Sequence, residues 1–269
     1  GGYDRFRGRI MFPLADVRSR ILGFSGRVLG DELPKYINTP QTRIFDKGKF
    51  LLGLNLAKGI IKENNEAIIV EGEMDFLMSF QAGVKNVVAS SGTALTAEQV
   101  VIASRYASSL AFSFDTDQAG KLALKRALDM TRYDDISIKA VVITEGKDPD
   151  ELIKIDPKKW ETVAENPVPI LEFFYQSLVT GRDLAKVEDK KQVAKEFLPI
   201  LATMSDAIER AYWIKKISND LGVGESYIQE TLAKTKPSSS PMKAEPKKIG
   251  VNDFKVSKEL LLLGSLILF

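Results

Sequence analysis

Short apolar runs alternate with helical patterns between residue 66 and about residue 156, and this alternation restricts the fold more than any other feature. The four runs are AIIV (67–70), NVVAS (86–90), SLAFSF (109–114) and IKAVVIT (138–144). Their length and their apolar content are typical of buried strands. Because each run is followed by a helix, we expect an α/β fold whose sheet is mainly parallel, with right-handed crossovers and flanking helices.

The segments between these runs read as amphipathic helices. EGEMDFLMSFQAG, after the first run, predicts a helix with Phe76, Leu77 and Phe80 facing the core. Thr96 and Gln99 have the spacing of a capping box, so a second helix should begin there. KLALKRALDM predicts a third helix directly after Gly120.

Polar clusters follow every one of the four predicted strands. Open α/β sheets bind their ligands at the carboxyl ends of the strands, so these clusters should meet on one edge. Carboxylates gathered there would raise each other's pKa and cost stability unless a divalent cation lay among them. The clusters are Glu71, Gly72 and Asp75; Ser90, Ser91, Gly92 and Thr93; Asp115 and Asp117; and Glu145, Gly146, Asp148 and Asp150.

Asp115 and Asp117 end the third strand in LAFSFDTDQAG. Residues two apart in extended backbone point the same way, so both carboxylates can bind one hard cation. The pair alone also fits a turn with a helix N-cap. An EF-hand loop fails because Arg126 stands where the closing Glu is needed, and an aspartate-nucleophile phosphatase usually carries the pair after its first strand.

Cysteine and histidine are both absent from the 269 residues. This excludes a thiol nucleophile, a disulfide, a Ser-His-Asp triad and a thiolate or imidazole metal site. Metal chemistry would use oxygen ligands, which favours magnesium, manganese or calcium. The longest apolar run, 260–269, is too short to cross a membrane, and no signal peptide is visible, so we expect a cytoplasmic protein. The missing first Met and the apolar final residues suggest a fragment of a longer chain.

Residues 1–50 form a basic block, with ten Lys and Arg against five Asp and Glu, whereas residues 66–156 carry fifteen acids and nine bases. A basic block beside an acidic one suits a metal enzyme that handles polyanions, although a solvated surface also explains scattered charges. Arg5, Arg7 and Arg9 alternate, so in a strand they would share one face suited to phosphates. An irregular loop then carries Lys35, Asn38, Arg43, Lys47 and Lys49.

Residues 157–235 are helical in pattern. The repeat of Val193, Phe197, Ile200, Leu201 and Met204 at helical spacing predicts a core face. KTKPSSSPMKAEPKK then reads as a linker, and FKVSKELLLLGSLILF as the start of another amphipathic helix. We therefore expect a basic α+β lobe at 1–64, a metal-binding domain at 65–156, a helical subdomain at 157–235, a linker at 236–250 and a truncated further domain at 251–269.

The motifs VEGEMD, FDTDQAG and EGKDPDE resemble, in order and spacing, the toprim domain of primases, topoisomerases and some nucleases. Four further motifs narrow the resemblance to the catalytic core of bacterial DnaG-type DNA primases: DRFRGRIMFPLAD, GFSGRVLG, PKYINTPQT and FDKGK. It runs from about Tyr3 to about residue 230. Two positions depart from the family pattern: Glu73 replaces a more usual aromatic residue and Ser91 a common Leu. Neither is a ligand position.

The resemblance implies DNA-templated synthesis of short RNA primers from nucleoside triphosphates for DNA replication. It implies that Mg²⁺ or Mn²⁺ is held by Glu71, Asp115 and Asp117, with Asp148 and Asp150 completing the second metal's surroundings and Asp75 in a supporting role. Glu71 could instead be a general base. Zinc would belong only to an N-terminal domain that this chain lacks.

The resemblance also implies partners. Arg27, Lys35, Asn38 and Lys47 would bind the incoming triphosphate, and Arg5, Arg7 and Arg9 the single-stranded DNA template. The RNA primer is a further ligand. The replicative helicase would bind through the domain that begins at 251–269, and the protein would work at replication forks on the bacterial nucleoid, not at a membrane.

Two other functions fit parts of the sequence. A toprim protein can cleave nucleic acid strands, but a topoisomerase of this type needs a nucleophilic Tyr in an additional domain for which this chain has no room. A non-catalytic nucleic-acid-binding scaffold would not need the full carboxylate set beside a basic loop.

Overall fold

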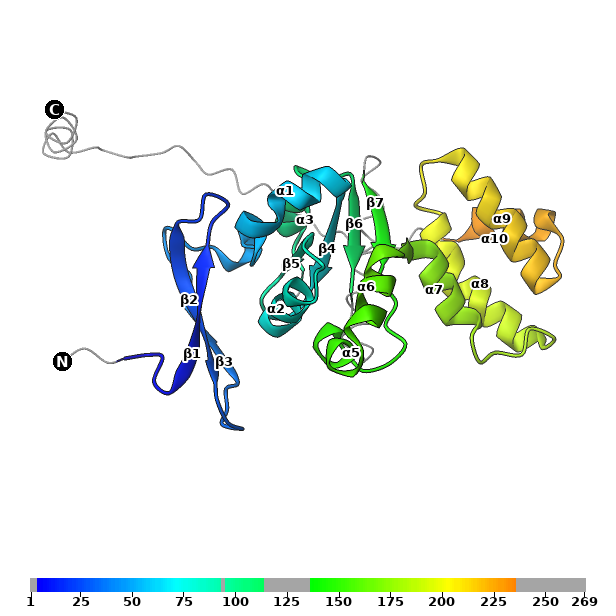
Figure 1. Cartoon of the computed structure of the whole chain (residues 1–269). Coiled ribbons are helices and arrows are strands. Elements are labelled where there is room, and N and C mark those ends of the chain that lie inside the picture. The colour runs from blue at the N-terminus through cyan, green and yellow to red at the C-terminus, as the bar shows by residue number, and fades with distance from the viewer. Residues whose placement is uncertain (1–3, 93–94, 114–135, 236–269) are drawn as a thin grey trace, which may run out of the picture.

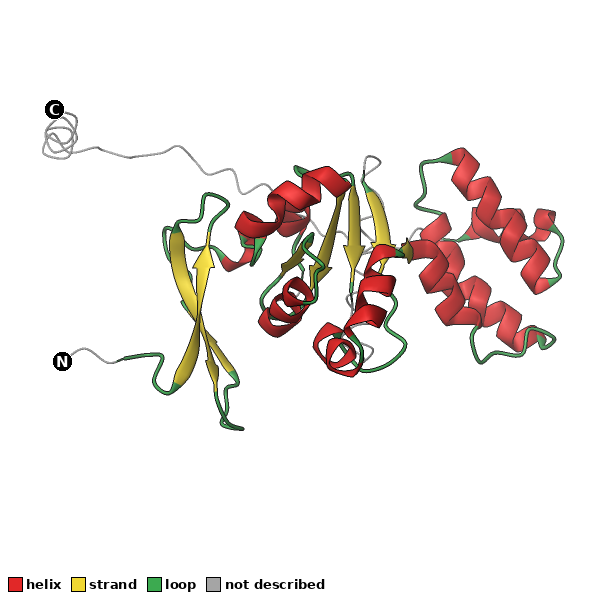
Figure 2. Cartoon of the chain, viewed as in Figure 1, coloured by secondary structure: helices red, strands yellow, loops and turns green. Residues whose placement is uncertain are grey.

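The computed structural model describes residues 4–92, 95–113 and 136–235. Within these residues the chain forms an elongated molecule with three parts in a row (Figure 1). A small antiparallel sheet lies at the N-terminal end, an α/β unit lies in the middle, and a bundle of helices lies at the C-terminal end (Figure 2). The predicted α/β class with a basic lobe and a helical subdomain is confirmed.

The N-terminal lobe is built on strands β1 (Arg9–Ala15), β2 (Ile21–Val28) and β3 (Tyr36–Asn38), which pair antiparallel in that order. A short 3₁₀ turn, η1 (Lys47–Lys49), follows. The prediction that Arg5, Arg7 and Arg9 share one strand face is wrong. Residues 5–8 form a turn in which Gly8 has a left-handed φ of 62°, so only Arg9 lies in the strand.

The central sheet has the order β5-β4-β6-β7-β8. Its parallel strands are β4 (Glu66–Val70), β5 (Val87–Ala89), β6 (Ser109–Phe112) and β7 (Ser137–Ala140), which confirms the four predicted strands. The sequence reading did not include β8 (Val168–Pro169), a two-residue strand that pairs antiparallel with β7.

Helices cover both faces of this sheet, which explains why its strands are mostly apolar. On one face lie α1 (Leu54–Asn64) and α3 (Ala97–Ser104), and on the other α2 (Glu73–Gln81), α5 (Pro149–Ile155) and α6 (Pro157–Glu165). In β4, Ala67 and Ile69 pack with α1 and α3, whereas Ile68 and Val70 pack with α2 and α6.

Two of the local helix predictions can be checked in detail. The capping box at α3 is confirmed, because Gln99 N donates to Thr96 Oγ1 over 3.1 Å and Thr96 N donates to Gln99 Oε1 over 3.0 Å. In α2, Phe76 is buried and Phe80 half-buried as expected. Leu77 is instead exposed, because α2 covers the sheet with a narrow stripe that Leu77 lies beside.

The C-terminal bundle consists of α7 (Ile170–Val179), α8 (Val187–Leu201), α9 (Ala207–Leu221) and α10 (Glu225–Lys234). Its centre is aromatic, with the Phe197 ring centroid 5.1 Å from those of Tyr175 and Trp213. In the predicted core stripe, Val193, Phe197 and Leu201 of α8 are buried, and Ile200 and Met204 are partly buried against the same core, Met204 after the end of α8. No described helix combines the length and apolar character needed to cross a membrane.

The predicted domain boundary after residue 156 remains a prediction. Trp160 of α6 packs in the core of the α/β unit, and β8 extends its sheet, so the packing favours a boundary near Pro169. The predicted helix after Gly120, the linker at 236–250 and the segment at 251–269 lie outside the described residues.

Candidate active site

The carboxyl ends of the parallel strands bring together segments that are far apart in the sequence. Glu71 follows β4, Ser90 follows β5, and the connection after β7 leads to Asp148, the N-cap of α5, and to Asp150 in the first turn of α5. Asp115 and Asp117, predicted to follow β6, lie outside the described residues. The described part of the chain therefore contains two of the three expected carboxylate clusters on one edge of the sheet.

The Asp75 carboxylate joins these two clusters. Its Oδ2 accepts a hydrogen bond of 2.9 Å from Gly72 N, and its Oδ1 accepts one of 3.3 Å from Asp150 N. One side chain thus holds the backbone next to Glu71 and the backbone of Asp150. Burial, reinforced by the charge of Asp148, raises the pKa of Asp75 to about 6. The supporting role predicted for Asp75 stays a prediction, and these two bonds link the segment after β4 to the first turn of α5.

The loop after β5 holds Glu71 from the other side. Ser90 Oγ and Gly92 N both donate to the carbonyl oxygen of Glu71, over 3.4 Å and 3.2 Å. Ser91 and Gly92 both have left-handed backbone, with φ of 58° and 67°. The Ser91 side chain is buried, and its hydroxyl has no hydrogen-bond partner in the structure as described. The sequence predicted a polar cluster in this loop, whereas the left-handed turn and its hydrogen bonds to Glu71 are visible only in the structure.

Asp148 and Asp150 differ in what they already bind. Asp148 is the N-cap of α5 and accepts a 2.8 Å hydrogen bond from Glu151 N. Asp150 Oδ2 pairs with Lys154 Nζ at 2.7 Å, while Asp150 Oδ1 is buried and has no hydrogen-bond partner in the described structure. A buried acceptor of this kind fits a cation, since such atoms are normally paired.

Within residues 4–92, 95–113 and 136–235, no three acidic side chains form a group that could hold a metal ion by themselves. Complete coordination would need further ligands beside the Glu71 and Asp148–Asp150 segments. The sequence offers Asp115 and Asp117 for that place, and their geometry stays a prediction.

The basic lobe faces the start of α2 across a cleft of about 520 Å³. Arg27 and Lys35 line this cleft together with Met74 of α2, so two of the four predicted triphosphate ligands lie beside the helix that follows Glu71. The Arg27 guanidinium carbon lies 5.7 Å from the centroid of the Tyr36 ring. Asn38 lies on the neighbouring strand, and its Oδ1 is buried without a partner in the described structure. Lys47 lies in η1 and is half-buried.

Arg9 is occupied in a structural role. Its guanidinium donates to the carbonyl oxygens of Gly26, Pro34 and Lys35, at 3.1, 2.9 and 3.2 Å. These bonds hold the β2–β3 loop, which carries Lys35, against the start of β1. Arg5 and Arg7 are exposed in the preceding turn. Template binding by the three arginines remains a prediction.

One connection between the lobe and the α/β unit was missed at the sequence level. Ser25 of β2 and Glu73 of α2 are both buried, and Ser25 Oγ donates to Glu73 Oε1 over 2.9 Å. Glu73 was noted only as a departure from a family pattern. A charged residue in a position that is usually aromatic was the signal that could have indicated a buried polar contact.

Three family models match consecutive parts of the chain. The DNA primase catalytic core N-terminal domain matches residues 1–58, a Toprim-like domain matches 68–153, and the DnaB-helicase binding domain of primase matches 171–226. The last match falls on α7–α9 and the start of α10, whereas the sequence analysis expected helicase contacts from residue 251 onward, outside the described residues.

Curated relatives and solved structures agree with these matches. The chain is 40% identical to the DNA primase of Clostridium acetobutylicum over 234 residues, which are 86% of this chain and 39% of that protein. It is 35% identical to the Escherichia coli K12 DNA primase over 237 residues, 86% of this chain and 41% of that protein. The chain spans about two fifths of the length of these relatives.

Among solved structures, a DNA primase domain from Pseudomonas aeruginosa superposes with a TM-score of 0.72 at 36% identity, covering 86% of this chain and 74% of that one. The DnaG primase catalytic domain bound to ssDNA gives 0.71 at 35%, covering 84% and 73%. A parallel sheet with acidic strand ends, matched by the Toprim-like model, defines a toprim protein. Within that class, the chain belongs to the family of bacterial DnaG-type primases.

Proposed function

We propose that this chain carries the catalytic part of a primase, which synthesises short RNA primers from nucleoside triphosphates on single-stranded DNA during replication. The observation that carries the proposal is the Asp75 bridge. It draws the Glu71 segment and the Asp148–Asp150 segment together within the part of the chain that the Toprim-like model matches.

Divalent cations, Mg²⁺ or Mn²⁺, would be held by five carboxylates: Glu71, Asp115, Asp117, Asp148 and Asp150. The buried Oδ1 of Asp150 would be one of the ligand atoms. Bound there, such cations would activate the 3′-hydroxyl of the primer and neutralise charge on the departing pyrophosphate. Asp75 would position the two acidic segments without binding metal itself. Lys154 pairs with Oδ2 of Asp150, so its ion pair leaves Oδ1 available to a cation.

The basic side chains would orient the substrates. Arg27 and Lys35 line the cleft beside α2, where they would bind the triphosphate, and Asn38 and Lys47 lie on neighbouring segments of the same lobe. The template backbone would be bound by Arg5, Arg7 and Arg9. Arg9 would also hold the β2–β3 loop beside the template. Phosphate contacts of this kind should be salt-sensitive and weakly dependent on sequence.

The replicative helicase is the proposed protein partner. The DnaB-helicase binding match supports contacts through residues 171–226, and further contacts could come from residues beyond 250. A bacterial replication enzyme of this kind would act in the cytoplasm, on the nucleoid.

The test is primer synthesis from labelled nucleoside triphosphates on a single-stranded template, with Mg²⁺ or Mn²⁺. Asp117→Asn and Asp150→Asn should each leave the melting temperature nearly unchanged and abolish synthesis, because each removes a ligand charge while keeping the side-chain shape. Glu230→Gln, on the exposed surface of α10, is the matched control and should keep wild-type activity.

Mn²⁺ binding followed by electron paramagnetic resonance gives a second readout that does not depend on turnover. Asp150→Asn should weaken Mn²⁺ binding, and Glu230→Gln should not. Wild-type synthesis by either Asp variant would remove that residue from the metal site. Strand cleavage in place of synthesis would favour a nuclease or topoisomerase activity.

A further inference from the structure

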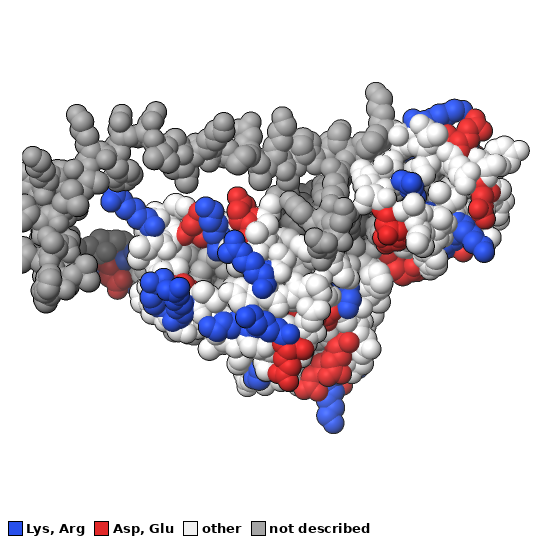
Figure 3. Space-filling model, turned by 90° about the horizontal axis from the view of Figure 1, so that it is seen from above, with Lys and Arg blue, Asp and Glu red and all other residues white. Residues whose placement is uncertain are grey.

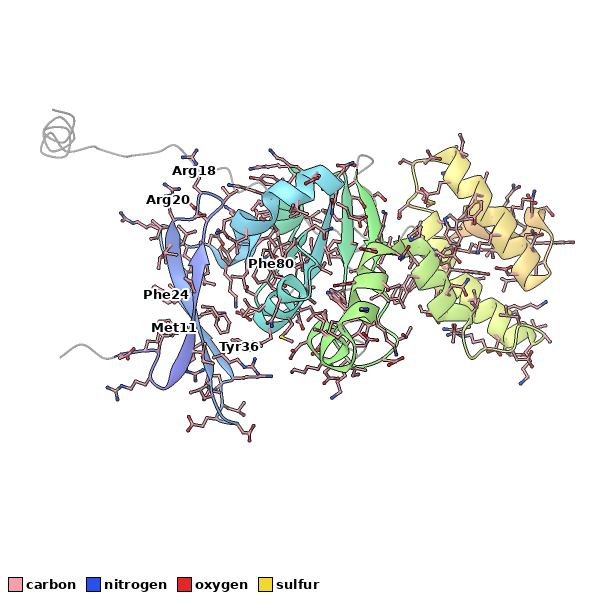
Figure 4. The ribbon with its side chains drawn as sticks, viewed as in Figure 1. Met11, Arg18, Arg20, Phe24, Tyr36 and Phe80 are labelled. Atoms are coloured by element: carbon pink, nitrogen blue, oxygen red, sulfur yellow. The ribbon has the colours of Figure 1, made fainter. Side chains whose placement is uncertain are left out.

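A row of basic side chains lies along α1 and the two segments beside it. Arg18 and Arg20 lie in the turn between β1 and β2, Lys58 and Lys62 on α1, and Arg105 directly after α3. Figure 3, which views the molecule from the side of α1, shows Lys and Arg gathered over this part. Figure 4 shows Arg18 and Arg20 together at the same end of the lobe. We call these five residues the α1 basic stripe.

Direct contacts join the β1–β2 turn to α1. Lys58 Nζ donates to the carbonyl oxygen of Val17 over 2.7 Å, which places it against the turn that carries Arg18. Asn55 of α1 contacts the same turn by a 3.2 Å hydrogen bond from its Nδ2 to Ser19 Oγ. The turn and the helix therefore form one continuous surface.

The other half of the stripe follows from helix geometry. Lys62 is four residues after Lys58, so it lies on the same face of α1, about 6 Å further along. Its Nζ lies 5.5 Å from the centroid of the Tyr106 ring, and Arg105 directly precedes Tyr106. The cations thus run from the β1–β2 turn along α1 to the end of α3, next to a half-buried aromatic ring.

Most of this positive charge is not neutralised. Arg20 pairs with Asp16, with its NH2 nitrogen 2.7 Å from Oδ2. For Arg18, Lys62 and Arg105, the described residues provide no acidic side chain at ion-pair distance, and all three are exposed. Clustered like charges repel each other, so a persistent row of cations suits an anionic partner.

One end of the stripe and the candidate active site lie at opposite ends of the sheet. α1 ends at Asn64, just before β4 begins, and Arg105 lies just before β6 begins. Lys62 and Arg105 are therefore at the amino ends of the strands, and the acidic segments are at their carboxyl ends. The five residues of β4 separate these two places by about 15 Å. This distance places Lys62 and Arg105 outside the reach of the reacting nucleotide.

We propose that the α1 basic stripe is a second contact surface for the single-stranded DNA template, away from the catalytic edge. A line of cations beside an aromatic ring is the arrangement that binds single strands, because the cations follow the phosphates and the ring can stack on a base. This inference rests on the proposed function in one respect, namely that the anionic partner is the template.

The test removes three stripe cations whose side chains make no described hydrogen bond: Arg18→Ala, Lys62→Ala and Arg105→Ala in one protein. Binding of an oligothymidylate of about 20 nucleotides is followed by fluorescence anisotropy over a range of salt concentrations. Loss of three phosphate contacts should weaken binding at least about fivefold at low salt. It should also make the plot of log affinity against log salt shallower by about 2, at about 0.7 per phosphate.

The matched control removes three exposed lysines of the helical bundle: Lys191→Ala, Lys195→Ala and Lys215→Ala. It changes net charge by the same amount and should leave the salt dependence unchanged. Equal melting temperatures of the three proteins would exclude unfolding as the cause. An unchanged slope in the stripe variant, or an equal loss in the control, would overturn the inference.

Two further outcomes separate this inference from the proposed function. If the wild type synthesises primers and the stripe variant binds the oligonucleotide as well as the wild type does, the proposed function holds and the stripe is not a template contact. If oligonucleotide binding depends on the stripe but the wild type incorporates no nucleotide, the stripe is a DNA contact and the proposed function is wrong. Stripe-dependent binding to phosphatidylserine vesicles, with unaltered binding to the oligonucleotide, would overturn the inference in favour of a membrane surface.

Discussion

Ser25 Oγ and Glu73 Oε1 form a buried 2.9 Å hydrogen bond that links the N-terminal lobe to the α/β unit. Ser25 lies two residues before Arg27 in β2, and Glu73 lies two residues after Glu71. The bond therefore connects the strand that carries a proposed triphosphate ligand to the helix that follows a proposed metal ligand.

Breaking this bond should destabilise the protein. Ser25→Ala leaves the buried Glu73 carboxylate without this donor, which should lower the free energy of unfolding by about 1–3 kcal/mol. Chemical denaturation measures the effect, and Ser177→Ala on the exposed side of α7 is the control, with an expected change within about 0.5 kcal/mol. If Ser25→Ala is as stable as the wild type, the bond contributes nothing to holding the two parts together.

The buried Asp75 should make stability depend on pH when a chelator removes metal. Its pKa is about 6 in the folded protein, against an ordinary 3.8, so the folded state binds the proton more tightly than the unfolded state. Stability should therefore fall as the pH rises from about 4 to about 6, by on the order of 2–3 kcal/mol, and then level off. Asp75→Asn should remove most of this dependence in urea denaturation at several pH values, and an unchanged profile would assign it to other groups.

Lys47 is expected to act on the nucleotide and not on the template. It lies in η1, whose Gly48 carbonyl oxygen accepts a 2.6 Å hydrogen bond from Thr96 Oγ1, so removing the Lys47 side chain should leave the fold intact. Lys47→Ala should raise the KM for nucleoside triphosphates more than it weakens DNA binding. Steady-state kinetics and anisotropy measure the two effects. Equal losses would move Lys47 from the triphosphate to the template.

Two glycines should respond in opposite ways to the same substitution. Gly59 is inside α1, and a methyl group added there would meet open space, so Gly59→Ala should stabilise the protein by about 1 kcal/mol through helix propensity. Gly222 ends α9 with a left-handed φ of 57°, so Gly222→Ala should cost about 1 kcal/mol. Thermal unfolding of both variants checks the pair. A shift of the same sign in both would contradict this account.

The sequence determined those features that depend on local pattern. Apolar runs of strand length specified β4, β5, β6 and β7, and the Thr96–Gln99 spacing specified the start of α3, because short-range periodicity and capping act within a few residues. The acidic strand ends were visible in the sequence for the same reason, since a parallel sheet always gathers them on one edge.

Only the tertiary structure decided which partners each side chain meets. Arg9 was expected to bind phosphate, and in the structure its guanidinium donates to one carbonyl oxygen of β2 and two of the β2–β3 loop, at least 17 residues away. The Ser25–Glu73 bond joins residues 48 positions apart, and Asp75 reaches Asp150 across 75. The α1 basic stripe combines cations from three separate elements. Such contacts depend on how whole elements pack, and no local spacing in the chain records that packing.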